Sequence, residues 1–110
     1  MLPLSRVTIL EYLDPNGRSP YAEWFDSLNA EAAGKVVVAV TRLGHGNLSN
    51  VKSVGAGVME QKIDFGPGYR IYFGRDGAEI VILLGGGTKK KQQNDVRSAI
   101  SCWQDYKKRK

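Results

Sequence analysis

Four polar residues at alternating positions are the first candidates for chemistry in this sequence. Glu60 and Lys62 lie in the stretch MEQKIDF, and Arg70 and Tyr72 lie in the stretch GYRIYF. Alternating polar and apolar residues predict two strands, with these four side chains on one face of a sheet. A carboxylate, two cations and a phenol held together can transfer protons and bind a phosphate. The simpler interpretation of the same face is a set of solvated cross-strand charge pairs.

The turn signal Gly66-Pro67-Gly68 joins the two stretches, because glycine adopts positive φ freely and proline fixes φ. Apolar side chains have to share the core face, and this requirement sets the expected register. Across a three-residue loop the expected pairs are Phe65–Tyr69, Ile63–Ile71, Asp64–Arg70 and Lys62–Tyr72. The face opposite the core is then expected to present Glu60, Lys62, Asp64, Arg70 and Tyr72.

A third strand over 80–84 is apolar at every position, as expected for a strand covered on both faces. Asp76-Gly77 predicts a two-residue hairpin turn before this strand. With that turn, Val81 and Leu83 are expected to share the polar face. The last helix of the chain is then expected to cover them.

A run of glycines and lysines follows the third strand, and its lysines are Lys89, Lys90 and Lys91. If Thr88 caps a helix, they occupy its first turn, where the helix dipole disfavours each cation by about 0.3–1 kcal/mol. A docked anion would explain this placement, since helix N–H groups, flexible glycines and ammonium groups would face one phosphate path. A helix that begins at 92–94 would remove the conflict. Lys52 lies in a predicted flexible connection, 44–56, and is a further candidate for RNA binding.

The other elements follow from periodicity and capping residues. A first strand is predicted over 6–14, and Ser19-Pro20 predicts the start of a helix. A second helix is predicted over 29–43, although its VVVAV run would also suit a strand. A last helix is predicted near 88–107. The sequence thus predicts one α+β domain over 1–110, with a small, mostly antiparallel sheet.

The net charge of +5 is concentrated in two clusters, at 89–91 and 107–110, and the rest of the chain carries −2. Clustered cations indicate a phosphate-bearing partner, although 107–110 alone would be interpreted as a solvated tail. No apolar run reaches the roughly 18 residues of a membrane span. The apolar stretch at the N-terminus is too short for a secretory signal, and charged residues follow it too early. A cytoplasmic protein is therefore expected. Cys102 has no metal-ligand companions, and no metal or other cofactor is expected. His45 lies alone in a predicted loop, where a histidine is usually exposed and inert.

The motifs GPGYRIYF and LLGGGTKKKQQ, followed by a helix with the pattern Asp-Val, Ala-Ile, Trp and Tyr-Lys, resemble a known group of bacterial proteins. The chain resembles type II toxins of the RelE/ParE superfamily, in the HigB-like branch of addiction module killer proteins. The resemblance covers nearly the whole chain. It implies a RelE-like toxin fold, with two N-terminal helices on one face of the sheet and a C-terminal helix beyond the last strand.

The resemblance also implies a function. Toxins of this branch are neutralised by a small antitoxin, expected here to be a helix-turn-helix DNA-binding protein. They usually cleave mRNA at the ribosome without a metal. By position, Arg70 matches the arginine that faces the scissile phosphate. Glu60 and Lys62 match the preceding strand, where relatives more often have Glu-x-Arg. Some relatives use histidines for proton transfer, and this sequence has none in the predicted sheet.

RNA supplies its own 2′-hydroxyl nucleophile, so the protein has to align it, stabilise the phosphorane and protonate the leaving oxygen. Arg70, with Lys62 or the lysines at 89–91, is expected to hold the phosphate. Glu60, or a lysine of lowered pKa, is a candidate base, and Tyr72 is a candidate stacking group or proton donor. Two alternatives remain: a ParE-like inhibitor of DNA gyrase and a catalytically inactive RNA-binding protein. The antitoxin is expected at Val81 and Leu83 or in a groove beside the last helix.

Overall fold

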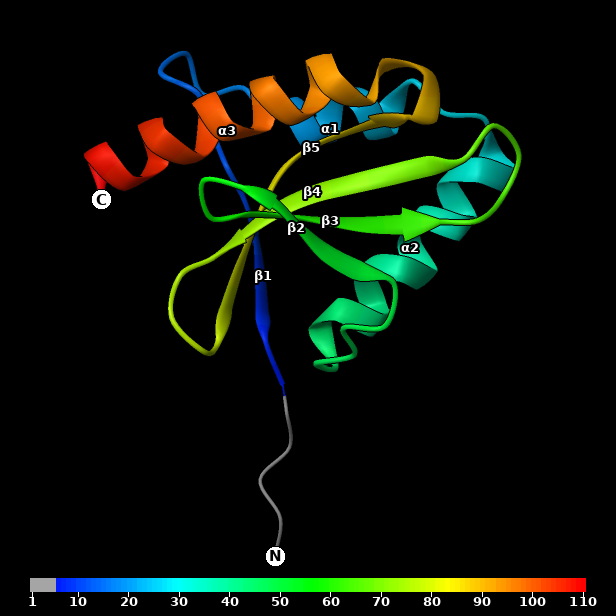
Figure 1. Cartoon of the computed structure of the whole chain (residues 1–110), viewed down its shortest axis with the longest axis horizontal. Coiled ribbons are helices and arrows are strands. Elements are labelled where there is room, and N and C mark those ends of the chain that lie inside the picture. The colour runs from blue at the N-terminus through cyan, green and yellow to red at the C-terminus, as the bar shows by residue number, and fades with distance from the viewer. Residues whose placement is uncertain (1–5) are drawn as a thin grey trace, which may run out of the picture.

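Five strands form one mixed sheet in the order β1-β5-β4-β3-β2, in which β1 and β5 are parallel and all other neighbours are antiparallel (Figure 1). The computed structural model describes residues 6–110, so the first residues of the N-terminal segment lie outside it. The strands are β1 (Thr8–Glu11), β2 (Val51–Gly55), β3 (Val58–Ile63), β4 (Tyr69–Arg75) and β5 (Ile80–Thr88). The helices are α1 (Pro20–Asp26), α2 (Ala30–Gly44) and α3 (Gln92–Arg109), with a 3₁₀ turn, η1, at Lys89–Lys91. Among these residues, none of the helices has the length and apolar character needed to cross a membrane.

The two N-terminal helices begin where their capping residues predict. The Ser19 hydroxyl accepts a hydrogen bond of 2.9 Å from the Ala22 N–H, and the Asn29 side chain accepts one of 2.8 Å from the Ala32 N–H. These bonds satisfy backbone donors that have no partner within the helix. The valine run at 36–40 is helical, because Val36 and Ala39 fill one buried stripe with Leu43.

Helices cover the sheet on both faces. One core lies between the sheet and α1 and α2, and it includes Tyr21, Val36, Leu43, Ile71 and Phe73. The other core lies between the sheet and α3, and it includes Tyr72, Ile82, Leu84, Ala99 and Trp103. The predicted α+β class is therefore confirmed, with two N-terminal helices on one face and the C-terminal helix on the other (Figure 1).

The register predicted for the first hairpin was wrong by two residues. Lys62 lies opposite Arg70 and Glu60 lies opposite Tyr72, because the strands are joined by the longer turn 64–68. Asp64 and Phe65 belong to this turn, and the Gly68 N–H donates to the Phe65 carbonyl at 3.0 Å. A slip of two residues preserves the faces, since side chains alternate with period two. Glu60, Lys62, Arg70 and Tyr72 therefore still share a face, whereas Asp64 does not belong to it.

The second hairpin was predicted incorrectly, with consequences for two core residues. Its turn is longer than Asp76-Gly77: the Asp76 N–H donates to the Ile80 carbonyl at 2.9 Å, and Arg75 lies opposite Val81. This odd shift exchanges the faces of β5. Val81 and Leu83 lie in the α1/α2 core, each 2% exposed, so they are neither under α3 nor open to an antitoxin.

The stretch 44–56 is not a flexible connection, because it contains β2. This strand pairs with β3 at the edge of the sheet, and Lys52 lies opposite Glu60. The sequence VKSVG gives little signal for it: two of its residues are half-buried and three are exposed. Its pairing with β3, rather than its own apolar pattern, makes it a strand.

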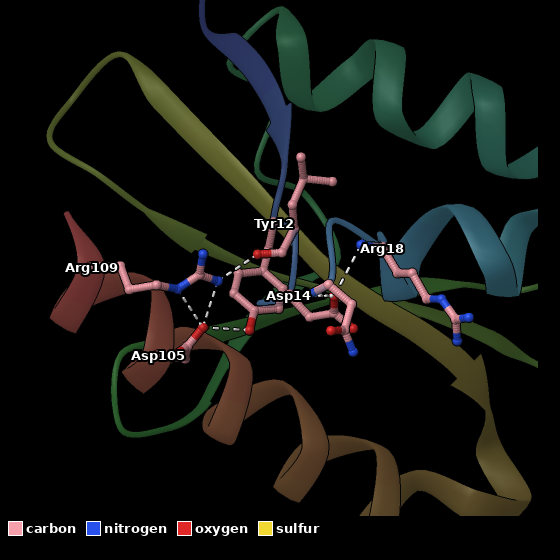
Figure 2. A network of polar contacts seen from close by, with 7 residues as sticks. Tyr12, Asp14, Arg18, Asp105 and Arg109 are labelled. Carbon is pink, nitrogen blue, oxygen red and sulfur yellow. Dashed lines mark hydrogen bonds and ion pairs between the residues drawn. The ribbon is translucent and has the colours of Figure 1, made fainter.

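The C-terminal end of α3 is attached to the residues that follow β1 by a polar cluster (Figure 2). The Tyr12 hydroxyl donates to Asp105 at 2.6 Å, and Arg109 Nε donates to the same carboxylate at 2.8 Å. Arg109 also donates to the Leu13 carbonyl. On the other side, Lys110 pairs with Asp76 at 2.6 Å. The final basic residues therefore include two that hold α3 in place, not only a solvated tail.

Candidate functional site

Two rows of residues cross the sheet on the face covered by α3. In the first row, Lys52 lies opposite Glu60, Glu60 opposite Tyr72, and Tyr72 opposite Gly85. In the second row, Lys62 lies opposite Arg70, which lies opposite Gly87. We call Lys52, Glu60, Lys62, Arg70 and Tyr72 the sheet cluster. The fold thus brings together the four residues predicted for catalysis and one predicted for RNA binding.

Three members of the sheet cluster are buried, which the sequence did not predict. Glu60 is 1% exposed, Arg70 is 6% exposed and Tyr72 is fully buried, whereas Lys62 and Lys52 are exposed. The start of α3 covers these three residues. The expected open, cationic sheet face is therefore a closed polar layer with exposed lysines at its border.

Glu60 is the centre of this layer. Its Oε2 accepts a hydrogen bond of 2.7 Å from Gln92 Nε2 and lies 3.5 Å from Arg70 Nε. Its Oε1 lies 3.8 Å from the Lys52 ammonium. A buried carboxylate is stable only when it is paired and hydrogen-bonded in this way. Gln92 was not singled out from the sequence, where a single amide at a helix start carries no distinctive signal.

Arg70 and Tyr72 keep unused hydrogen-bonding capacity. Within residues 6–110, the buried Nε and Nη1 of Arg70 have no hydrogen-bond partner, and Nε contacts Glu60 only as an ion pair. The buried Tyr72 hydroxyl has no partner in hydrogen-bonding geometry, although the Glu60 carboxylate lies close enough to raise its pKa. Leaving a buried polar group unsatisfied costs about 1–3 kcal/mol, and more for a charged group. Unsatisfied buried groups call for an explanation, such as a catalytic role or a bound water.

The protonation state of Tyr72 follows from its surroundings. Burial raises the pKa of its phenol, and the carboxylates of Glu60 and Asp95 raise it further, while Arg70 opposes them. The hydroxyl therefore stays protonated at neutral pH and can donate a proton or a hydrogen bond. Burial also raises the pKa of Asp95, against the opposing effect of the Lys91 ammonium.

The glycine run after the third strand is required for packing rather than for flexibility. All three glycines lie within β5. A Cβ on Gly86 would stand 2.2 Å from the Trp24 ring, and a Cβ on Gly87 would stand 1.9 Å from Asp95 Oδ2. Only Gly85, beside Tyr72, has nothing within 4 Å of such a Cβ. The expectation that these glycines are flexible was therefore wrong.

The lysines at 89–91 form the 3₁₀ turn η1, and the α-helix begins at Gln92. This is the alternative in which no lysine occupies the first turn of an α-helix. All three side chains are exposed. The Lys89 N–H donates to the Gly68 carbonyl at 2.9 Å. Lys89 Cβ and Arg70 Nη1 each lie 3.7 Å from the point where a Cβ on Gly68 would stand, so both side chains lie beside Gly68.

The other reactive residues lie outside this site. Burial raises the pKa of the Cys102 thiol, which packs in the core under α3. His45 is exposed at the end of α2. Within the part of the chain that the structure describes, no three His, Cys, Asp or Glu side chains come together as metal ligands would.

Comparison with known proteins gives the family. Residues 23–101, which span all of the sheet cluster and most of α3, match the family model described as phage derived protein Gp49-like (DUF891). An uncharacterized protein of Haemophilus influenzae (strain ATCC 51907 / DSM 11121 / KW20 / Rd) is 39% identical over 80 residues, covering 72% of this chain and 81% of the relative. The chain therefore belongs to the Gp49-like family of phage-derived proteins.

Proposed function

We propose that this protein is the toxin of a type II toxin–antitoxin module and cleaves mRNA through 2′-hydroxyl attack, with the ribosome presenting the RNA. The observation that carries the proposal is the buried guanidinium of Arg70. Two of its nitrogens have no hydrogen-bond partner within residues 6–110, and exposed Lys62 and Lys89 border it. Arginine binds phosphate through paired donors, and an oriented, desolvated guanidinium stabilises developing phosphorane charge strongly.

Each neighbour of Arg70 has a role in this proposal. Glu60 orients the guanidinium through the 3.5 Å ion pair, and its carboxylate is the base for the 2′-hydroxyl. Tyr72 is the acid for the leaving 5′-oxygen. Its raised pKa keeps the phenol protonated, and the proton moves only to the more basic alkoxide as the bond between phosphorus and the 5′-oxygen breaks. Lys62 neutralises a neighbouring phosphate from the exposed end of β3.

RNA reaches this layer at the end of the sheet where β3 ends, β4 begins and η1 follows β5. Gly68 has no side chain, and Arg70 Nη1 and Lys89 lie on either side of it. Gln92, whose side chain donates a hydrogen bond to Glu60, is the first residue of α3. In our proposal, an incoming phosphate takes over the unused Arg70 donors while the Gln92 side chain turns away.

The partners follow from this role. A small helix-turn-helix antitoxin would neutralise the toxin, and the groove beside α3 is its expected dock now that Val81 and Leu83 are known to be buried. Membership of the Gp49-like family agrees with the resemblance of the sequence to addiction module killer proteins.

A ParE-like inhibitor of DNA gyrase is the second candidate, and the burial of Glu60 and Arg70 favours it, since a protein-binding toxin needs no open catalytic face. Induction in a bacterial culture separates the two. We expect growth arrest with new mRNA 5′ ends in primer extension, and loss of both effects in Arg70→Lys, which keeps the charge but loses the paired donors. Arrest with intact mRNA and altered plasmid supercoiling would indicate the gyrase mechanism instead.

A further inference from the structure

A pocket of about 320 Å³ lies on the face of the sheet opposite the sheet cluster, between α2 and the end of β3. Its walls come from α2, the connection between α2 and β2, the end of β3 and the following turn. This volume is at the lower end of the range for small-ligand sites, about 300–1,000 Å³.

A single buried side chain gives the pocket its chemistry. Gln61 lines it and is 4% exposed. Its Nε2 donates to the Ala39 carbonyl at 3.2 Å, which fixes the orientation of the amide. Its buried Oε1 has no partner within residues 6–110. This buried acceptor lies in a lining residue of the pocket and would gain a partner if an N–H or O–H group of a ligand displaced the side chains that cover it.

The rim of the pocket is cationic. Lys35, Arg42 and Lys62 line it, and Asp64 is the single carboxylate among its lining residues. The lining also includes apolar side chains, among them Val38 and Phe65. A ligand that fits carries an anion at one end and a flat, partly apolar group with hydrogen-bond donors at the other. A nucleotide has this combination, with its phosphate at one end and its base at the other.

Lys62 connects this pocket with the sheet cluster. It is among the residues that line the pocket, while its side chain lies on the other face of β3, on the same face as Arg70, its partner in the β3–β4 pairing. We propose that the pocket binds one nucleotide of an RNA strand, with the base donating to Gln61 Oε1 and the phosphate contacting Lys35 and Arg42. This inference rests on the proposed function for the source of the nucleotide. It makes the pocket a recognition site for a nucleotide that neighbours the cleaved one.

Nucleotide binding can be tested without cleavage. The four ribonucleoside 5′-monophosphates, titrated to roughly millimolar concentration, are followed by the amide NMR signals of the full chain. We expect at least one to give saturable shifts at residues 61–65 and at the Gln61 side-chain amide. Gln61→Met, which preserves the length of the side chain, should weaken that binding by about threefold to tenfold. Lys35→Gln and Arg42→Gln should weaken it too, whereas Arg18→Gln, at an exposed position outside the pocket, should not.

The role of Gln61 as acceptor has its own control ligand. If adenosine monophosphate binds, purine riboside monophosphate, which lacks the amino donor, should bind more weakly to the wild type and equally to Gln61→Met. Absence of shifts at 61–65 with all four nucleotides would overturn the inference, and so would shifts unaffected by Gln61→Met in a variant of unchanged melting temperature. Shifts there caused only by an acidic peptide would assign the pocket to a protein partner and also overturn it.

The source of the nucleotide is tested with a short RNA. Competition between the RNA and the mononucleotide at residues 61–65 would assign the pocket to an RNA strand, and its absence would overturn that assignment. Because these shifts do not depend on cleavage, a protein that binds nucleotides here without cutting RNA would refute only the proposed function.

Discussion

Arg70 Nε lies 3.5 Å from Glu60 Oε2, and both side chains are almost completely buried. Burying an ion pair removes water from both charges, and only mutual attraction and additional hydrogen bonds offset that cost. Glu60 has the additional hydrogen bond, from Gln92, whereas Arg70 has none from the residues that the structure describes. The pair is thus half-satisfied, and the unsatisfied half is the cation that would face a phosphate.

Removing one partner of this pair should destabilise the fold more than removing both. Glu60→Gln leaves the Arg70 charge buried without a counter-ion, so we expect a loss of about 3–5 kcal/mol in the free energy of unfolding. The double variant Glu60→Gln with Arg70→Met should recover most of this loss. Urea denaturation of the two single variants and the double variant measures the coupling. Additive losses would show that the two side chains do not stabilise each other.

Two glycines on the α3 side of the sheet should respond oppositely to a methyl group. A Cβ on Gly74 would stand 2.5 Å from the Trp103 ring, so Gly74→Ala should cost about 1–3 kcal/mol through overpacking. Gly85→Ala meets nothing within 4 Å and should be neutral or stabilising by up to about 1 kcal/mol. Thermal unfolding of both variants checks the contrast. Equal losses would mean that Trp103 does not lie against Gly74.

The exposed lysines of η1 should contribute to RNA affinity through charge. Lys89→Gln, Lys90→Gln and Lys91→Gln together should weaken binding of single-stranded RNA and reduce the salt slope by about 0.7 for each phosphate that is no longer neutralised. Lys108→Gln, near the far end of α3, is the control and should leave the slope unchanged. Binding isotherms at several salt concentrations provide the measurement, and an unchanged slope in the triple variant would remove these lysines from the RNA site.

Acid should loosen the attachment of α3 to the residues that follow β1. The hydroxyl of Tyr12 and then the guanidinium of Arg109 lower the pKa of Asp105. The folded state therefore binds fewer protons there than the unfolded state. The ionised Asp105 carboxylate therefore stabilises the fold fully above the ordinary aspartate pKa of about 4. This stabilisation is lost as the pH falls through the lowered pKa of Asp105 in the folded state.

Asp105→Asn should accordingly lower the melting temperature at neutral pH, and its difference from the wild type should shrink below about pH 4. Asp26→Asn, at an exposed position of α1, serves as the control with no expected difference at either pH. A difference for Asp105→Asn that persists unchanged in acid would show that the Tyr12–Asp105–Arg109 cluster is not stabilised by charge.

The elements with strong local signals were predictable from the sequence. Ser19 and Asn29 are capping residues with one favoured role, and the helices begin beside them. The strand period of two placed Glu60, Lys62, Arg70 and Tyr72 on one face even though the register was wrong by two residues. Because an even slip preserves the faces, that error had no effect on the composition of the sheet cluster.

What escaped prediction depends on contacts between distant segments. The odd shift at the second hairpin exchanged the faces of Val81 and Leu83, and no local pattern distinguishes a two-residue turn from a longer one at Asp76-Gly77. Strand β2 forms because β3 offers a free edge. The burial of Glu60 and Arg70 depends on where α3 begins and on Gln92, which contacts Glu60 across 32 positions of sequence. The residues next to Glu60 and Arg70 in the sequence indicate neither the start of α3 nor the contact with Gln92.

The most direct test of the central claim, that Arg70 is held ready for an RNA phosphate, is the rate at which the purified protein cleaves a 5′-labelled mRNA in the presence of ribosomes. Arg70→Lys should reduce the single-turnover rate by at least about tenfold at an unchanged melting temperature, since it loses the paired donors but keeps the charge. Arg75→Lys, at the exposed end of the same strand, should cleave at the wild-type rate. A folded Arg70→Lys protein that cleaves as fast as the wild type would contradict the claim.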